Sequence, residues 1–173
     1  MTDSTVLVDT EKQHFAAEVY KAFLHCCARI VGSQDGVITA YDGDRVMAVF
    51  IGDSKNSNAA TAALKIHHAT RNIINPALKA QYPQTTYALK HVVGIDTSSL
   101  FVARTGIRGA NDLVWVGRAA NHAAKLCGLT GDYPSWITVD VYNALNDSAK
   151  YTKGQNMWEA RTWTAMNNRS IYR

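Results

Sequence analysis

Residues 36 to 50 read Gly-Val-Ile-Thr-Ala-Tyr-Asp-Gly-Asp-Arg-Val-Met-Ala-Val-Phe. Two β-prone runs flank the Asp42-Gly43-Asp44 segment, and an Asp-Gly pair between such runs is a strong signal for a β-hairpin. The second run, residues 46–51, is apolar on both faces, so we expect it at the centre of a sheet. The chain is therefore expected to be organised around this hairpin.

Helices and strands alternate on both sides of the hairpin. A short apolar run over residues 6–8 ends at Asp9 and predicts a first strand, and helical spacing over residues 15–30 predicts a helix. After the hairpin, the pattern predicts a helix over 62–73 that fades near Pro76, strands over 87–95, 100–103 and 113–116, and a helix over 118–126 that Gly128 and Gly131 close. The tail predicts strands at 136–139, 158–162 and 171–172, with a short helix between the first two.

The element order is β-α-β-β-α-β followed by a mixed tail. This is the ferredoxin-like plan of an α+β fold with C-terminal additions. A chain of 173 residues with 47% hydrophobic and 18% charged residues suits one globular domain over 1–173.

Charge and cysteine content narrow the class of function. The net charge of +4 favours anionic partners, and a nucleoside triphosphate would suit as well as nucleic acid. The cysteines, at 26, 27 and 127, form no CxxC pair, which argues against a disulfide framework and a zinc site. No leader and no apolar run of membrane-spanning length is visible, so we expect a cytosolic protein without a membrane partner.

Two aspartates are expected at strand ends. Asp9 ends the predicted first strand, and Asp44 lies in the hairpin turn. In a β-α-β-β sheet the first and third strands are neighbours, so the two carboxylates would lie side by side, where a divalent cation such as Mg²⁺ or Mn²⁺ would offset their repulsion. Taken singly, each aspartate also fits a helix cap or a turn. The helix expected after Asp9 would offer free N–H groups near Thr10 to a phosphate.

A polar stripe runs along the helix predicted over 118–126. Arg118, Asn121 and Lys125 stand at i, i+3 and i+7 and share one face, and His122 borders them. The small apolar residues expected to pack on the sheet are Ala120, Ala123, Ala124 and Cys127. The alternative for Arg118 and Lys125 is that they lie on a solvated helix face without a function. This alternative explains Asn121 less well, because Asn is a poor helix former.

Three segments in order resemble the class III nucleotide cyclases. Residues 36–50 resemble their hairpin, residues 93–97 (Val-Gly-Ile-Asp-Thr) their "GIHTG" strand, and residues 116–126 their "G-x-x-V-N-x-A-x-R-L" helix. The resemblance covers most of residues 4 to 140. Within the class, residues 108–121 look most like the bacterial pyrimidine cyclases of the Pycsar anti-phage systems, which make cyclic UMP or cyclic CMP.

The resemblance implies a homodimeric enzyme with two Mg²⁺ or Mn²⁺ ions per site. It implies that Asp9 and Asp44 bind the ions and that Asn121 orients the ribose from the opposite subunit. Lys125 stands where the family has a catalytic Arg, and Arg118 is a possible substitute one turn earlier. Ala40 and Val114 replace the purine-reading Lys and Asp. Tyr41 is then a candidate to bind a smaller base, and Thr10 and Lys153 are candidates to bind the triphosphate. The spacing between Asp9 and Asp44 is shorter than in the family.

These patterns favour a pyrimidine nucleotide cyclase that converts UTP to cyclic UMP. The alternatives are a cytidylate cyclase and an inactive nucleotide-binding domain, which the Lys at position 125 would suit. A ferredoxin-like nucleic-acid module would need exposed aromatic residues on its strands, and residues 46–51 offer Val and Met there. We therefore expect no nucleic-acid partner.

Overall fold

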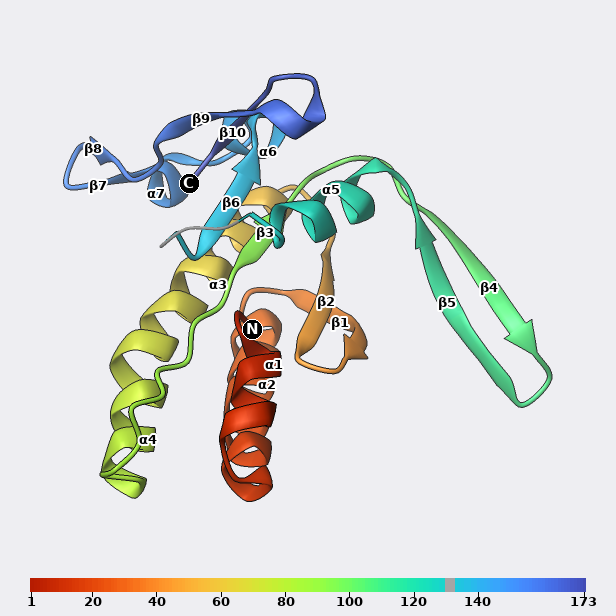
Figure 1. Ribbon diagram of the computed structural model, residues 1–173. Coiled ribbons are helices and arrows are strands. Elements are labelled where there is room, and N and C mark those ends of the chain that lie inside the picture. Colours follow the sequence, from red (N-terminus) through yellow and green to blue (C-terminus); the bar gives the residue numbers. More distant parts are fainter. Residues whose placement is uncertain (130–132) are drawn as a thin grey trace. The chain divides into compact units, whose positions relative to one another are not determined.

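The computed structural model describes residues 1–129 and 133–173. The chain divides into two compact units, Met1–Val92 and Val93–Arg173 (Figure 1). The prediction of one domain over 1–173 stays a prediction. Gly131, expected to help close a helix, lies outside the described residues.

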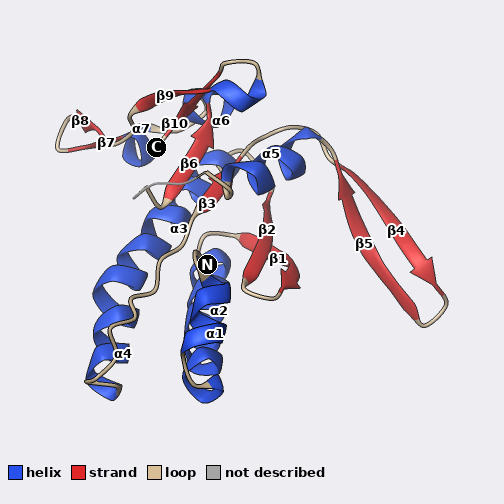
Figure 2. Ribbon diagram, viewed as in Figure 1, coloured by secondary structure: helices blue, strands red, loops and turns tan. Residues whose placement is uncertain are grey.

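The first unit is mainly helical, with one hairpin. Its elements are α1 (Ser4–Thr10), α2 (Gln13–Ser33), β1 (Gly36–Asp42), β2 (Arg45–Phe50), α3 (Lys55–Ala69), the π-helical turn η1 (Thr70–Ile74) and α4 (Asn75–Gln81) (Figure 2). Buried side chains from α1, α2, α3, η1 and α4 form its core, among them Leu7, Phe15, Val19, Phe23, Ile66 and Leu78.

The strand predicted over residues 6–8 is wrong, because this segment forms α1. The backbone N–H of Leu7 donates to the Asp3 carbonyl oxygen at 3.1 Å, and the N–H of Glu11 donates to the Leu7 carbonyl oxygen at 3.0 Å, which is the i to i−4 pattern of an α-helix. The Thr10 hydroxyl donates to the Val6 carbonyl oxygen at 2.7 Å, one helical turn back. A run of three apolar residues is too short for its periodicity to distinguish a strand from a helix.

The hairpin forms as predicted, with an irregularity in β1. Ile38 pairs with Ala48 and Ala40 pairs with Met47, so Thr39 is an extra residue, a β-bulge. Among the described residues β2 pairs with β1 alone, and the expected place at the centre of a sheet is not observed. The physical reason is that the neighbouring strand expected on its other side is helical.

The helix predicted to fade near Pro76 continues to Gln81. Pro76 lies in the first turn of α4, where its missing N–H needs no intrahelical partner. The π-helical turn η1 precedes it and joins α3 to α4. Pro76 therefore lies just after a π-helical turn within a continuing helical segment, and it does not mark the end of that segment.

The second unit contains a four-stranded sheet and a separate long hairpin. Its elements are β3 (Val93–Ile95), β4 (Phe101–Ile107), β5 (Ala110–Val116), α5 (Arg118–Leu126), β6 (Ser135–Thr138), α6 (Val139–Asn143), α7 (Asp147–Lys150), β7 (Tyr151–Thr152), β8 (Gln155–Asn156), β9 (Ala160–Trp163), the 3-10 turn η2 (Thr164–Met166) and β10 (Arg169–Tyr172). The sheet order is β3-β6-β10-β9, with β3 parallel to β6 and the other pairs antiparallel.

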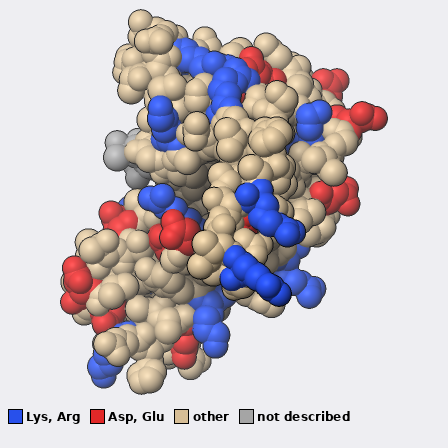
Figure 3. All heavy atoms as spheres, turned by 90° about the vertical axis from the view of Figure 1, so that its right-hand side faces the viewer, with Lys and Arg blue, Asp and Glu red and all other residues tan. Residues whose placement is uncertain are grey.

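Most expectations for this unit are confirmed. The helix over 118–126 and the strands of the tail are present, but the strand predicted over 87–95 is limited to β3. The face drawn in Figure 3 carries both basic and acidic side chains. Within residues 1–129 and 133–173, no helix is both long enough and apolar enough to cross a membrane.

Candidate functional site

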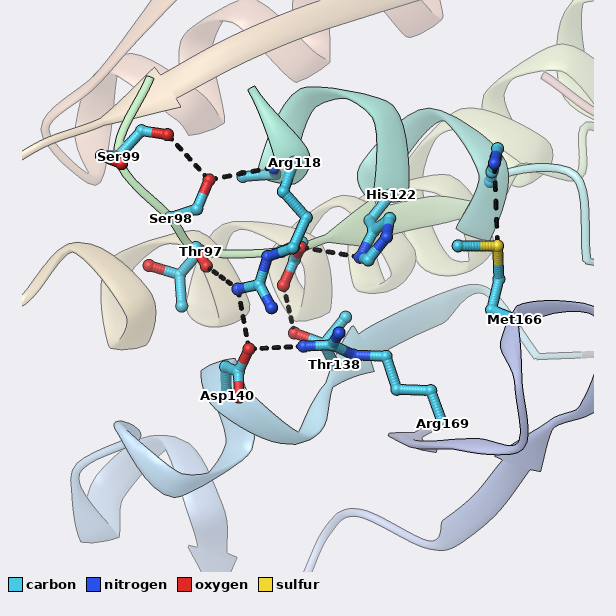
Figure 4. Close-up of polar contacts among 12 residues, drawn as sticks. Thr97, Ser98, Ser99, Arg118, His122, Thr138, Asp140, Met166 and Arg169 are labelled. Atoms are coloured by element: carbon cyan, nitrogen blue, oxygen red, sulfur yellow. Dashed lines mark hydrogen bonds and ion pairs between the residues drawn. The ribbon is translucent and has the colours of Figure 1, made fainter. Parts of the chain in front are cut away.

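The loop that follows β3 holds the first turn of α5. The N-cap residue of α5 is Gly117, which has no side chain to accept from the free N–H groups of the helix. The Ser98 hydroxyl takes this role and accepts from the backbone N–H of Ala119 at 3.0 Å (Figure 4). A Cβ at Gly117 would lie 2.9 Å from the Ser99 carbonyl oxygen, so only glycine allows this close approach.

A buried carboxylate, Asp96, lies directly after β3. Its Oδ1 accepts from the Thr138 hydroxyl at 2.5 Å, and its Oδ2 lies 3.0 Å from Nδ1 of His122 (Figure 4). The Asp96 side chain is 0% exposed. Both atoms are shielded from solvent and neither makes a hydrogen bond of regular geometry in the described residues, so the contact is electrostatic, and the nearby carboxylate favours the imidazole tautomer with its proton on Nδ1.

The Arg118 guanidinium has three partners within its own unit. Its Nη2 donates to the Thr97 carbonyl oxygen at 2.6 Å and lies 2.7 Å from Oδ2 of Asp140, while Nε lies 3.6 Å from Oδ2 of Asp96. The same Asp140 oxygen also accepts from Nη2 of Arg169 at 2.6 Å. Arg118, a predicted catalytic cation, is therefore directed toward protein groups.

Asn121 and Lys125 lie on the exposed face of α5. The buried face is made by Ala119, His122 and Leu126. Asn121 makes no side-chain hydrogen bond to the described residues, and the Lys125 ammonium has only the Met166 sulfur, at 3.7 Å. These two polar side chains are placed together as predicted, and both are accessible to a ligand or a partner.

The apolar stripe predicted for α5 is displaced by about one residue. Ala120 and Ala123 are half-buried, but Ala124 and Cys127 are exposed. His122 takes the buried position instead, because Asp96 offers its ring a partner and the Trp163 ring contacts it edge-on, with centroids 5.7 Å apart. The sequence shows no partner for His122, and for this reason it predicts His122 at the border of the polar face and not on the buried face.

In the first unit, Asp44 lies in the hairpin turn with a cation beside it. The ammonium group of Met1 is 2.8 Å from its Oδ2. Partial burial would raise the pKa of Asp44, but hydrogen bonds from this ammonium and from the Ser4 side chain, with the positive charge, bring the pKa below its ordinary value. Asp44 is therefore held as a carboxylate.

The structure does not bring Asp9 and Asp44 together. Asp44 meets the start of α1 through Met1 and Ser4, whereas Asp9 lies exposed in the last turn, five residues after Ser4 and about 7.5 Å farther along the helix axis. Among residues 1–129 and 133–173, no group of three His, Cys, Asp or Glu side chains is arranged to hold a metal ion. The described residues thus do not fit the paired two-ion site, and the metal roles of the two aspartates stay predictions.

Thr10 ends α1 and does not begin a helix. Its hydroxyl is used within α1, and the free N–H groups that follow belong to the start of α2, at Gln13. The predicted phosphate cradle near Thr10 is therefore wrong, because residues 4–10 form a helix that ends at Thr10. Lys153 lies exposed in the turn between β7 and β8 with a positive φ of 50°, next to Gly154.

The candidate base-binding residues lie on two hairpins. Ala40 and Tyr41 follow the bulge in β1, and Tyr41 is 56% exposed and pairs with Val46. Val114 lies in β5 opposite Ala103 and is 41% exposed. Ala40, Tyr41, Asp9, Asp44 and Thr10 thus belong to the first unit. The second unit carries the other predicted site residues, namely Val114, Arg118, Asn121, Lys125 and Lys153.

Sequence reasoning missed the carboxylates that bind Arg118 and the residues that bind these carboxylates in turn. Asp96, Thr138, Asp140 and Arg169 come from separate parts of the second unit, and only the fold brings them together. Asp96 did carry a signal, because it directly follows the apolar strand β3, in the same way as Asp9 was thought to follow a strand. The parallel neighbour β6 ends at Thr138, which a sheet model would have placed at the same edge.

The chain is closely similar to known cyclases in sequence. It is 59% identical over 170 residues to a uridylate cyclase of Xanthomonas perforans, covering 98% of this chain and 73% of that protein. It is 56% identical over 163 residues to a uridylate cyclase of Burkholderia cepacia, covering 94% and 70%. The chain belongs to the uridylate cyclase family. The prediction of a nucleotide cyclase is thereby confirmed, although no protein-family model matches the sequence.

The fold of this cyclase agrees with that assignment. The solved guanylyl cyclase Cya2 has a TM-score of 0.81 with 15% identity, covering 99% of this chain and 85% of that one. The predicted α+β class III cyclase fold is confirmed by this likeness, although α1 replaces the expected first strand.

Proposed function

We propose that this cyclase converts UTP to 3′,5′-cyclic UMP and pyrophosphate, with sites completed by a second copy of the chain. The observation that carries the proposal is the exposed Asn121 and Lys125 pair on α5, in a chain 59% identical to a uridylate cyclase. Among the described residues, the Asn121 side chain makes no hydrogen bond, and Lys125 makes only the long contact with the Met166 sulfur at 3.7 Å. Their exposure therefore supports a role toward a substrate held in part by another protomer.

The reaction needs an oriented ribose and neutralised phosphate charge. The 3′ oxygen forms a bond to the α-phosphorus, the bond from that phosphorus to the bridging oxygen of pyrophosphate breaks, and the 3′ hydroxyl proton leaves to solvent. The Asn121 amide holds the ribose, which lowers the entropic cost of the attack. The Lys125 ammonium stabilises the charge that builds on the phosphorus and the leaving pyrophosphate.

The hairpin of β4 and β5 supports assembly into a homodimer. Its strands pair only with each other among the described residues, and large apolar side chains are exposed on it. Phe101 and Ile107 are 71% and 76% exposed. A two-stranded ribbon is at best marginally stable alone, so a second copy that covers these side chains would stabilise it.

Base selection is proposed for Tyr41. Its phenol is exposed on β1, next to Ala40, so it is free to bind a pyrimidine edge. Ala40 and Val114 leave no charged or amide group for a purine at the two positions that the resemblance assigned to purine reading. Uracil and cytosine differ at N3 and C4, and cytidylate cyclase activity is the alternative.

A divalent cation, Mg²⁺ or Mn²⁺, is part of the proposal as the ion that accompanies the triphosphate, and Asp44 is the proposed carboxylate ligand. Two ions per site, with Asp9 as the second ligand, stay a prediction, because the described residues do not form that pair. Thr10 and Lys153 stay candidates for the triphosphate. The cytosolic location and a role in anti-phage defence also stay predictions.

Product analysis tests the proposal. The purified chain is incubated with ATP, GTP, CTP or UTP in separate reactions with Mn²⁺, and pyrophosphate and cyclic nucleotide are measured by mass spectrometry. We expect cyclic UMP from UTP. Cyclic CMP as the main product would show that the chain is a cytidylate cyclase. Nucleotide binding without any product would show that it is an inactive nucleotide-binding domain.

A further inference from the structure

We propose that Asp96, Arg118 and Asp140 act as positioning residues that fix the direction of α5, and that Arg118 does not contact the substrate. The inference rests on the proposed function, because it concerns how Asn121 and Lys125 are presented to the nucleotide. The three residues are named here the α5 clasp. The clasp joins the end of β3, the first turn of α5 and the start of α6 (Figure 4).

The charges of the clasp and its neighbours balance one another. Asp140 faces two guanidinium groups, those of Arg118 and Arg169, at 2.7 and 2.6 Å. Asp96 faces Arg118 on one side and the imidazole of His122 on the other. The two guanidinium groups, those of Arg118 and Arg169, thus meet the two carboxylates of Asp96 and Asp140. Nε and Nη2 of Arg118 are directed toward protein groups, so a phosphate could bind through these two atoms only if the contacts were given up.

The clasp lies at the point where the helix direction is set. Arg118 is the first residue of α5, and Asn121 follows it by three positions, on the next turn. The Asn121 side chain has no hydrogen bond of its own in the described residues, so its position depends on the helix backbone. A tilt of the first turn moves Asn121 directly, and a misplacement of about 1 Å can cost about 100-fold in rate.

A double-mutant comparison separates positioning from substrate contact. We expect Asp140→Asn and Arg118→Lys each to lower kcat for UTP by about 10- to 100-fold while KM changes little, and the double variant to be no slower than the slower single variant. If Arg118 instead binds the triphosphate, Asp140→Asn releases it, kcat is unchanged, and the proposal is overturned. Glu159→Gln, which removes an ion pair with Arg173 in the same unit, serves as the matched control and leaves kcat unchanged.

A readout independent of activity tests the clasp directly. In long-range ¹H–¹⁵N spectra we expect His122 of the wild-type chain to show a proton on Nδ1, and Asp96→Asn to alter that signature. We also expect Asp140→Asn to shift the Asn121 amide signals, and Glu159→Gln to leave them in place. Unchanged Asn121 signals in Asp140→Asn would refute the clasp. A wild-type chain that makes no cyclic nucleotide would refute the proposed function, and these spectra would still decide the clasp.

Discussion

Gly94 in β3 passes so close to Ala123 in α5 that a Cβ at position 94 would lie 2.2 Å from the Ala123 carbonyl oxygen. Gly94→Ala therefore forces α5 away from β3, and we expect it to destabilise the chain by about 1–3 kcal/mol. Urea unfolding followed by circular dichroism measures the loss. Gly32→Ala, which meets nothing within 4 Å, is the control and leaves stability the same or slightly higher. Equal stability of the two variants would contradict the packing.

Stability is expected to fall as the pH is lowered toward 4. Burial, followed by the charge of His67, lowers the pKa of His91 to about 4, whereas an exposed imidazole titrates near 6.5. The unfolded chain therefore binds this proton more readily, and stability is lost progressively between about pH 6.5 and 4, by an amount on the order of 3 kcal/mol. Urea unfolding at several pH values measures the slope. His91→Leu should flatten it, and His25→Gln, at an exposed site, should not.

Sites shared between protomers predict that two inactive variants restore each other. Asn121→Ala and Asp44→Asn lie in different units of the chain, and we expect each alone to lose most of its UTP turnover. In a co-expressed mixture, half of the dimers are mixed and each has one intact site, so activity recovers to about a quarter of the wild-type value. Asp42→Asn, in the same turn as Asp44, is the matched control for the hairpin. No recovery in a sample whose mixed dimers are confirmed by mass spectrometry would contradict a shared site.

The exposed apolar residues of β4 predict a weakened dimer when they are made polar. Phe101→Ser combined with Ile107→Ser removes the two most exposed of these side chains in β4. We expect a folded chain that dissociates at concentrations where the wild type is dimeric, because less apolar area is buried on association. Light scattering after size-exclusion chromatography measures the mass. Ile51→Ser, at a site 80% exposed in the first unit, should leave the mass unchanged.

The phenol of Tyr41 predicts a specific loss of base recognition. Tyr41→Phe removes one hydrogen bond and leaves the ring, and a neutral hydrogen bond contributes about 1 kcal/mol. We therefore expect kcat/KM for UTP to fall by about 5- to 10-fold, with the dimer intact. Initial rates with UTP and with CTP measure the effect. An unchanged kcat/KM for both nucleotides would exclude Tyr41 from the base site.

Periodic elements could be predicted from the sequence, whereas isolated short segments could not. The sequence placed α5 from Arg118 to Leu126, although its buried face was predicted about one residue away, and the Asp-Gly pair located the β1–β2 hairpin. The run at residues 6–8 is too short to show a period, so a strand and a helix fit it equally well. The spacing between Asp9 and Asp44 is shorter than in the family, which indicates a difference in this region but does not show that residues 4–10 are helical.

The role of a charged residue depends on partners that are distant in sequence. Asn121 and Lys125 were identified from the helix alone, because exposure on one face follows from spacing. Arg118 belongs to the same stripe but turns toward Asp96 and Asp140, which come from other elements. Helical periodicity predicts the face of the helix on which a residue lies, but it does not predict which groups the charged end of a long side chain contacts.

The bulge at Thr39 allows β1 to hold one residue more than β2 while the pairing beyond it stays regular. Before the bulge Val37 and Ile38 pair with Val49 and Ala48, and after it Ala40 and Tyr41 pair with Met47 and Val46. Residues that face each other across an antiparallel pair lie on the same side of the hairpin, so the pairing with Val46 fixes the side on which the Tyr41 ring lies. A homologous chain that lacks the extra residue but keeps this pairing would therefore present the same tyrosine face to a base, whereas a slip of β1 by one residue against β2 would turn it away.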